Sequence, residues 1–260
     1  MRSRRPCTPR RSASCATRRP SPLASDALSA LRASLGERLR TGAGAAPPPP
    51  ALLDVVVQRF EVGRGGDVVL VLPADWEQLR HEEGAAGAPV PYWARPWPSG
   101  LALARALAAD PPASGIRVLE LGCGLGAPSI VAARAGARVL ATDGHPDAVV
   151  FAAHALALNA VVADVAEVDW GAHGEALAAL GPFDLVLAAD VLYTEANVRA
   201  ALALWPRLVA PGGELRLADP RRAGARDVLA AARATFALES EDRDAAVVLH
   251  RLRPHACAAP

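Results

Sequence analysis

A glycine-rich segment near the middle of the chain carries the clearest chemical signal. Residues 118–121 are apolar except for Glu120 and are typical of a buried strand, and the sequence Gly-Cys-Gly-Leu-Gly follows at 122–126. Glycine allows a turn too tight for other residues and a close approach of backbone to ligand. At the start of the next helix, backbone N–H groups could then face that ligand. The segment therefore predicts a strand, a ligand-binding turn and a helix in succession.

A second predicted strand ends in Asp143, one helix length further on. A carboxylate in this place binds the ribose hydroxyls of adenosine cofactors. Gly122, Gly124 and Ala127 also satisfy the pattern of dinucleotide-binding proteins, so the glycines alone do not exclude NAD. Glu120, just before the first glycine, would repel a pyrophosphate but tolerate a positively charged ligand. The pattern thus favours an enzyme with an adenosine-type cofactor other than NAD.

Composition limits the other classes of function. A chain of 260 residues with 52% hydrophobic residues can form one domain with an appendage. The first 50 residues hold ten arginines against two acids, whereas the other 210 hold 18 against 25. An acidic core argues against a nucleic-acid substrate. Four cysteines and six histidines lack metal-ligand spacing, and no apolar run is long enough to cross a membrane. We therefore expect no nucleic acid, metal or membrane partner.

The composition also divides the chain into four parts. They are a basic leader and linker at 1–50, a hairpin and aromatic pre-core segment at 51–115, a core at 116–253, and a tail at 254–260.

The leader allows more than one interpretation. Residues 1–24 are rich in arginine and serine and hold no acid, as in a mitochondrial or plastid transit peptide. An over-long gene model or a disordered tail explains them equally well. The protein is accordingly expected in a mitochondrion or plastid if the leader is a transit peptide, and otherwise in the cytoplasm. Leucines at helical spacing predict an amphipathic helix at 25–39, before a proline-rich linker at 41–50.

The core alternates strands and helices. Strands are predicted at 117–121, 138–142, 163–168, 183–189 and 214–218, with helices at 128–135, 146–159, 195–209 and 222–235. Before the core, strands at 54–61 and 67–72 suggest a hairpin, and helices are expected at 73–83 and 101–109. Such alternation predicts an α/β fold with a mostly parallel sheet covered on both faces. Ligands bind at the carboxyl ends of these strands, where four acids fall: Glu120, Asp143, Asp169 and Asp190.

The order of these features resembles the class I S-adenosylmethionine-dependent methyltransferases. The shared features are the glycine turn, the ribose acid Asp143, the pair Asp169-Trp170, and the strand ending at Asp190. The resemblance implies a Rossmann-like sheet of seven strands, closed by an antiparallel pair near 236–240 and 245–252. It also implies S-adenosylmethionine as the cofactor.

Further motifs resemble the seven-β-strand protein-lysine methyltransferases. Asp190-Val191-Leu192-Tyr193 matches their D-x-x-Y signature. The segment Pro-Tyr-Trp-Ala at 91–94, with Trp97-Pro98, resembles the branch that includes the lysine methyltransferase of the electron transfer flavoprotein β-subunit. Residues 218–222 resemble that branch's G-D-P-G-R, although Arg221 replaces its glycine. The partner implied is a protein with an accessible lysine, methylated by a monomeric enzyme.

Other acceptors remain open. Amide and adenine N-methyltransferases place two prolines after the acid of the fourth strand, where this chain has Val191-Leu192. Small-molecule amine N-methyltransferases share the glycine turn and stay possible. A non-catalytic binding module with a degenerate site is a further alternative.

The resemblance also assigns roles to individual residues. Asp190 would orient the acceptor amine and Tyr193 would wall its channel, although a strand cap and core packing are the respective alternatives. The residues assigned to the cofactor are Trp97, Glu120, Gly122, Cys123, Gly124, Asp143, Gly144, Asp169, Trp170 and Ala189. Within this set, the backbone at 122–124 would hold the methionine portion, and Glu120 would face its ammonium group through water or orient the loop. Asp169 and Trp170 would meet the adenine, and Trp97 would close the pocket unless it is structural.

Overall fold

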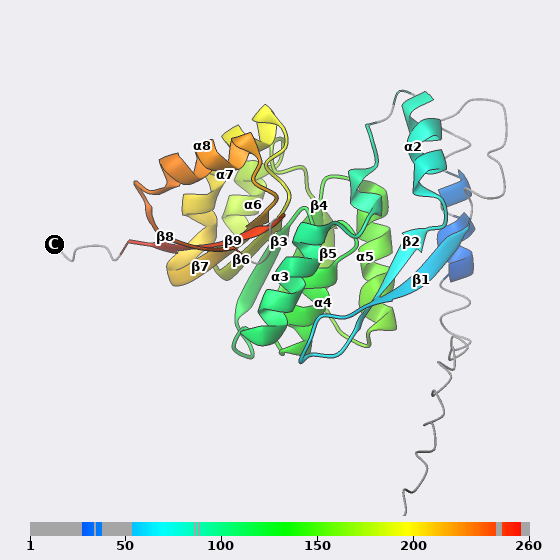
Figure 1. Ribbon diagram of the computed structural model, residues 1–260, viewed down its shortest axis with the longest axis horizontal. Helices are drawn as coiled ribbons and strands as arrows, with labels where there is room; N and C mark the ends of the chain where they lie inside the picture. The colour runs from blue at the N-terminus through cyan, green and yellow to red at the C-terminus, as the bar shows by residue number, and fades with distance from the viewer. Residues whose placement is uncertain are drawn as a thin grey trace, which may run out of the picture.

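A seven-stranded sheet forms the centre of the protein (Figure 1). The computed structural model describes residues 28–33, 35–37, 54–85, 87, 89–242 and 246–255. The strands of the sheet are β3 (Arg117–Leu121), β4 (Arg138–Asp143), β5 (Asp164–Glu167), β6 (Phe183–Ala189), β7 (Val209–Asp219), β8 (Phe236–Asp242) and β9 (Val248–Pro254). Their order across the sheet is β5-β4-β3-β6-β7-β9-β8. The first five are parallel, and β9 pairs antiparallel with both β7 and β8.

Helices cover both faces of this sheet (Figure 1). They are α3 (Pro98–Ala109), α4 (Ala127–Arg134), α5 (Pro146–Leu158), α6 (Gly174–Leu180), α7 (Glu195–Leu208) and α8 (Ala223–Ala232). The alternation of side chains along β6 separates two apolar clusters: Leu185 and Leu187 pack with α3 and α4, whereas Val186 and Ala188 pack with α7 and α8. Burial on both faces explains why β6 is a nearly continuous apolar run.

The chain changes direction across the sheet at β3. It runs from β3 to β4 and β5 on one side, then crosses over to β6 on the other side. In such sheets, a crevice opens at the carboxyl ends of the two strands that flank the switch point. The fold therefore directs a ligand to the turns that follow β3, β4 and β6.

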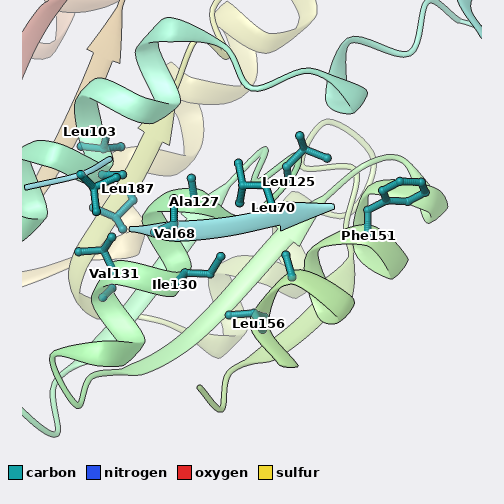
Figure 2. Packing of buried hydrophobic residues seen from close by; sticks show 14 of the residues in the cluster. Val68, Leu70, Leu103, Leu125, Ala127, Ile130, Val131, Phe151, Leu156 and Leu187 are labelled. Atoms are coloured by element: carbon teal, nitrogen blue, oxygen red, sulfur yellow. The ribbon is translucent and has the colours of Figure 1, made fainter. Parts of the chain in front are cut away.

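A separate hairpin, β1 (Val55–Phe60) and β2 (Val68–Pro73), packs on the outer side of α4 and α5. Figure 2 shows Val68 and Leu70 of β2 against side chains from these helices, among them Ile130, Phe151 and Leu156. The short helix α2 (Trp76–Ala85) and the 3₁₀ turn η2 (Tyr92–Ala94) then lead from the hairpin to α3. The pre-core segment is thereby brought back to the carboxyl edge of the sheet.

Asn159 fastens the hairpin to the core. Its side-chain amide donates to the carbonyl of Val69 (2.7 Å), while its Oδ1 accepts from the N–H of Val69 (3.0 Å). Arg134 also donates to Oδ1 (2.6 Å). One side chain thus satisfies both backbone groups of Val69 in β2, since a partly buried N–H or C=O without a partner is costly.

The structure confirms the predicted fold class and sheet, with element ends shifted by a few residues. The predicted helix at 25–39 is confirmed for the described residues 28–33 and 35–37, where Leu31 and Leu35 are buried in the core, although this part of the chain had been assigned to a leader. The rest of the predicted leader and most of the tail lie outside the described residues. Helix α6 was not predicted. Among the described residues, no helix is long and apolar enough to span a membrane.

Replacing Asn159 by alanine should lower the free energy of unfolding by about 1–3 kcal/mol, because Val69 would lose two hydrogen-bond partners. Urea denaturation monitored by circular dichroism measures this change. Val162→Ala is the control: Val162 is 92% exposed nearby, and its truncation should change stability by less than about 0.5 kcal/mol. Equal denaturation midpoints for the two variants would contradict the role given to Asn159.

Candidate functional site

A cavity of about 330 Å³ opens at the carboxyl ends of β3, β4 and β6. All twelve residues that the sequence predicted for the site line it: Trp97, Glu120, Gly122, Cys123, Gly124, Asp143, Gly144, Asp169, Trp170, Ala189, Asp190 and Tyr193. The topology explains this convergence, because the carboxyl ends of parallel strands lie at one edge of the sheet.

The glycine turn needs glycine for steric reasons. Gly122 and Gly124 have φ values of +66° and +51°, which other residues rarely adopt. A Cβ on Gly122 would lie 2.9 Å from Cγ1 of Val191, and one on Gly124 would lie 3.2 Å from the carbonyl oxygen of Trp93. The turn is thus pressed against the loop after β6 and against η2, and it leaves open backbone as the cavity floor.

Two backbone N–H groups of the glycine turn already have partners inside the protein. The N–H of Cys123 donates to the carbonyl of Thr142 (2.9 Å), and the N–H of Gly124 donates to Oδ2 of Asp143 (2.9 Å). Both donors are used inside the protein. The turn at 122–124 can therefore offer a ligand close approach and shape, but not these two donors.

Glu120 acts on the loop itself. It is 1% exposed, and its Oε2 accepts hydrogen bonds from the backbone N–H and the hydroxyl of Ser129, in the first turn of α4. Burial raises the pKa of Glu120 to about 8 against these hydrogen bonds, which lower it. The geometry therefore supports the second role predicted for Glu120, orienting the loop, since the carboxyl group fixes the start of α4.

Asp143 links two turns at the centre of the site. Its Oδ2 accepts from the N–H of Gly124 and its Oδ1 from the N–H of His145 (3.0 Å). Burial raises its pKa, while these backbone hydrogen bonds oppose the rise. Each carboxylate oxygen can accept a second hydrogen bond. Asp143 can thus bind two neighbouring hydroxyl groups while it holds the turns, and Gly144 beside it lacks a side chain that would approach Asp169.

The pair Asp169-Trp170 forms another wall. Asp169 is exposed, and its Oδ1 accepts from the N–H of Gly171 (2.8 Å), which fixes the turn after β5. Trp170 lines the cavity but is only 9% exposed, because it also packs in the apolar cluster with Leu177 and Leu204. Asp169 therefore combines a structural hydrogen bond with a carboxylate edge at the cavity, and Trp170 contributes a fixed apolar surface.

An aromatic rim, which we define as Tyr92, Trp97 and Tyr193, also lines the cavity. Tyr92 contacts Tyr193 edge to face, with ring centroids 5.7 Å apart, and lies 6.1 Å from the ring of Trp97. The indole N–H of Trp97 donates to the carbonyl of Tyr92 (2.6 Å). Tyr92 and Tyr193 are 45% and 48% exposed. Core packing is therefore not the role of Tyr193, whose half-exposed side chain lines the cavity.

Asp190 stands beside this rim in an unusual conformation. Its φ of +56° lies in the left-handed region, and its N–H donates to the carbonyl of Ala218 (2.9 Å). Its carboxylate, 9% exposed, forms an ion pair with Arg222 through Oδ1 and Nε. Asp190 thus ends β6, as the strand-cap alternative required, but its side chain also lines the cavity.

Several site residues were missed from the sequence. Tyr92, Trp93, His145 and Asn197 also line the cavity, and Arg222 contacts it through Asp190. Trp93 stacks on the imidazole of His145 with centroids 5.2 Å apart. The available signals were the unusual aromatic content of 91–97 and the two arginines after Pro220. Within the part of the chain that the structure describes, no cluster of His, Cys, Asp or Glu could hold a metal ion.

Comparison with known proteins gives consistent matches. Residues 94–227 match a family model described as lysine methyltransferase. The chain is 37% identical over 137 residues to the electron transfer flavoprotein beta subunit lysine methyltransferase of Xenopus laevis, covering 51% of this chain and 54% of that protein. The Danio rerio protein of the same name is 37% identical over 139 residues, 52% of each chain. The chain thus spans about half the length of the curated relatives it matches.

Solved structures support the fold alone. The T. thermophilus 16S rRNA N2 G1207 methyltransferase, in complex with AdoMet and guanosine, matches with a TM-score of 0.60 and 21% identity, over 81% of this chain and 53% of that one. The N-methyltransferase NodS of Bradyrhizobium japonicum, in complex with S-adenosyl-L-homocysteine, matches with a TM-score of 0.50 and 23% identity. The match covers 64% of this chain and 92% of that one.

The protonation of Glu120 should make stability depend on pH. Its pKa in the folded protein, about 8, lies above the ordinary value of 4.5, so the folded state holds the proton more tightly. The stability that the protonated Glu120 contributes is therefore fully present below about pH 4.5 and is lost as the pH rises towards 8. Each pKa unit corresponds to about 1.4 kcal/mol, so the loss reaches several kcal/mol at most. Thermal unfolding of the ligand-free protein between pH 5 and 8 measures it.

Glu120→Gln mimics the neutral acid and should flatten this pH dependence. Glu167→Gln, at the exposed end of β5, is the matched control and should leave the slope as it is in the parent protein. If the unfolding temperature depends on pH in the same way in Glu120→Gln and in the parent protein, burial does not raise the pKa of Glu120.

Proposed function

The chain belongs to the lysine methyltransferase family, whose cofactor is S-adenosylmethionine, and we propose that it methylates the side-chain amine of a lysine in a protein substrate. The proposal is carried by one observation: a carboxylate suited to a ribose, Asp143, and a carboxylate beside an aromatic rim, Asp190, line the same cavity. The two carboxylates have different surroundings, backbone N–H groups for Asp143 and an arginine and aromatic rings for Asp190, as a donor site and an acceptor site require.

The residues present fit the cofactor. The cavity volume lies within the range of small-molecule sites. A Cβ at Gly122 or Gly124 would clash with its neighbours, so the turn keeps the cavity floor free of side chains. Asp143 would hold the ribose hydroxyls, and Asp169 and Trp170 would meet the adenine. When bound, the cofactor supplies a methyl group on a positively charged sulfur.

The acceptor must reach this methyl group as a neutral amine. A lysine has an ordinary pKa of about 10.4, and partial burial near a positive charge favours its neutral form. Asp190 would orient the amine through a hydrogen bond. The faces of Tyr92 and Tyr193 suit the ammonium ion as it enters. Positioning of this kind supplies most of the rate increase in a reaction that needs little acid or base chemistry.

The electron transfer flavoprotein β-subunit is the first acceptor to test, because relatives at 37% identity are named for it. A further relative, 37% identical over 131 residues and half of each chain, is named ubiquinone biosynthesis O-methyltransferase of Rhizobium rhizogenes. The family match and the D-x-x-Y residues favour a lysine over a hydroxyl acceptor.

The test uses S-adenosylmethionine with a tritiated methyl group, the purified β-subunit, and separately an extract of soluble proteins with its small molecules. We expect label in a protein band, and mass spectrometry should place it on a lysine side chain. The enzyme contains no lysine, so it cannot add a background of its own side-chain amines. Label found only in small molecules, or only on oxygen, would contradict the proposal.

Two substitutions should separate binding from transfer. Asp143→Ala should weaken the binding of S-adenosylhomocysteine roughly 10- to 100-fold, because two charged hydrogen bonds to the ribose are lost. Asp190→Asn should leave that affinity within about threefold but lower kcat roughly 100-fold or more. Isothermal titration calorimetry and the tritium assay measure the two effects. Unchanged binding in Asp143→Ala would remove this residue from the ribose site, and full turnover in Asp190→Asn would remove that residue from the reaction.

A further inference from the structure

Arg222 fixes the carboxylate that lies next to the acceptor site. Its Nε forms an ion pair with Oδ1 of Asp190, and its guanidinium carbon lies 5.7 Å from the ring centre of Tyr193. The hydrogen bond to Asp190 is the main cause that raises the pKa of Arg222. The residue is 38% exposed in its side chain, whereas Asp190 is 9% exposed. The arginine thus approaches Asp190 from the solvent side.

The backbone of Arg222 is itself held in place. Its N–H donates to Oδ1 of Asp219 (2.7 Å), a fully buried residue at the end of β7. The preceding residue, Arg221, has a φ of +63°, so the chain turns sharply before α8 begins. Gly224 then packs α8 closely on the loop after β6, since a Cβ there would lie 2.7 Å from the carbonyl oxygen of Leu192. Arg222 therefore projects from a rigid turn.

The ion pair engages only one oxygen of Asp190. Among the described residues, none donates a hydrogen bond to its Oδ2. Asp190, Tyr193 and Asn197 are among the described residues that line the cavity, whereas Arg222 is not. The guanidinium group thus holds one oxygen of a carboxylate that lines the cavity, and no described residue holds the other oxygen.

We propose that Arg222 is a positioning residue: it orients Asp190 so that Oδ2 accepts a hydrogen bond from the substrate amine. This inference rests on the proposed function, because it concerns the same acceptor site. An arginine suits the task because its guanidinium is always charged and its planar donors impose a direction on the carboxylate. Without it, a carboxylate on a left-handed residue would be free to rotate about its side-chain bonds.

The experiment compares Arg222→Gln and Arg222→Lys with the parent protein. It uses the tritium assay with the electron transfer flavoprotein β-subunit and with the soluble extract. Arg222→Gln should lower kcat about tenfold or more, while KM for the acceptor and the affinity for S-adenosylhomocysteine stay within about twofold. Arg222→Lys should recover part of the rate, because it restores the charge. Thermal unfolding of each variant shows whether the fold is retained.

Two further variants sharpen the test. Arg222→Gly, assayed with added guanidinium ion, should regain activity if the guanidinium group itself orients Asp190. Arg221→Gln is the control: its side chain is exposed and pairs with Asp242 (3.0 Å), away from the cavity, so activity should be unchanged.

Each outcome decides the matter. A rate for Arg222→Gln within twofold of the parent protein overturns the inference, and a faster rate shows that Arg222 competes with the substrate amine instead. Loss of activity with a lowered unfolding temperature, and with no recovery in Arg222→Lys or from guanidinium, assigns Arg222 a structural role only. If the parent protein methylates neither the β-subunit nor any extract protein, the proposed function fails and this inference falls with it.

Discussion

The arrangement of the site depends on the hydrogen bonds that Asp143 accepts from the backbone. One oxygen binds the N–H of Gly124 after β3, and the other binds the N–H of His145 after β4. These bonds fix the separation of two turns at the switch point of the sheet. They also offset the burial that raises the pKa of Asp143. A carboxylate held on both oxygens has little freedom to move, so it is prepared for a ligand before the ligand arrives.

The fold could be predicted from the sequence because its signals are local. The central strands β3 and β6 are largely apolar runs followed by a glycine and an acid, respectively, and these features follow from burial on both faces and from the tight turns at the carboxyl edge. Once the strands are known to be parallel, the acids that end them must lie at one edge. This is why Glu120, Asp143, Asp169 and Asp190 all line one cavity, although they are distributed over 71 positions of the chain.

The partners of these residues could not be predicted in the same way. A sequence shows that Asp190 ends a strand, but its ion pair comes from Arg222, 32 positions later, and depends on how β7 and α8 are placed beside β6. Likewise, the N–H of Gly124 donates to Asp143, 19 positions away, a partner that the spacing of the glycines does not reveal. Helix α6 has only seven residues, too few for a helical period to be recognised.

The two carboxylates of the cavity are fixed by different means, and the difference matches what each would do. Among the described residues, those that donate hydrogen bonds to Asp143 do so through backbone N–H groups, whose positions follow from the turns themselves. Asp190 has a left-handed backbone, which costs roughly 1 kcal/mol or more, and its carboxylate is held by a side chain from another element. Strain of this kind persists only where the surrounding structure holds the residue in place. A binding group needs only to be rigid, whereas a group that meets an incoming amine must also point in one direction.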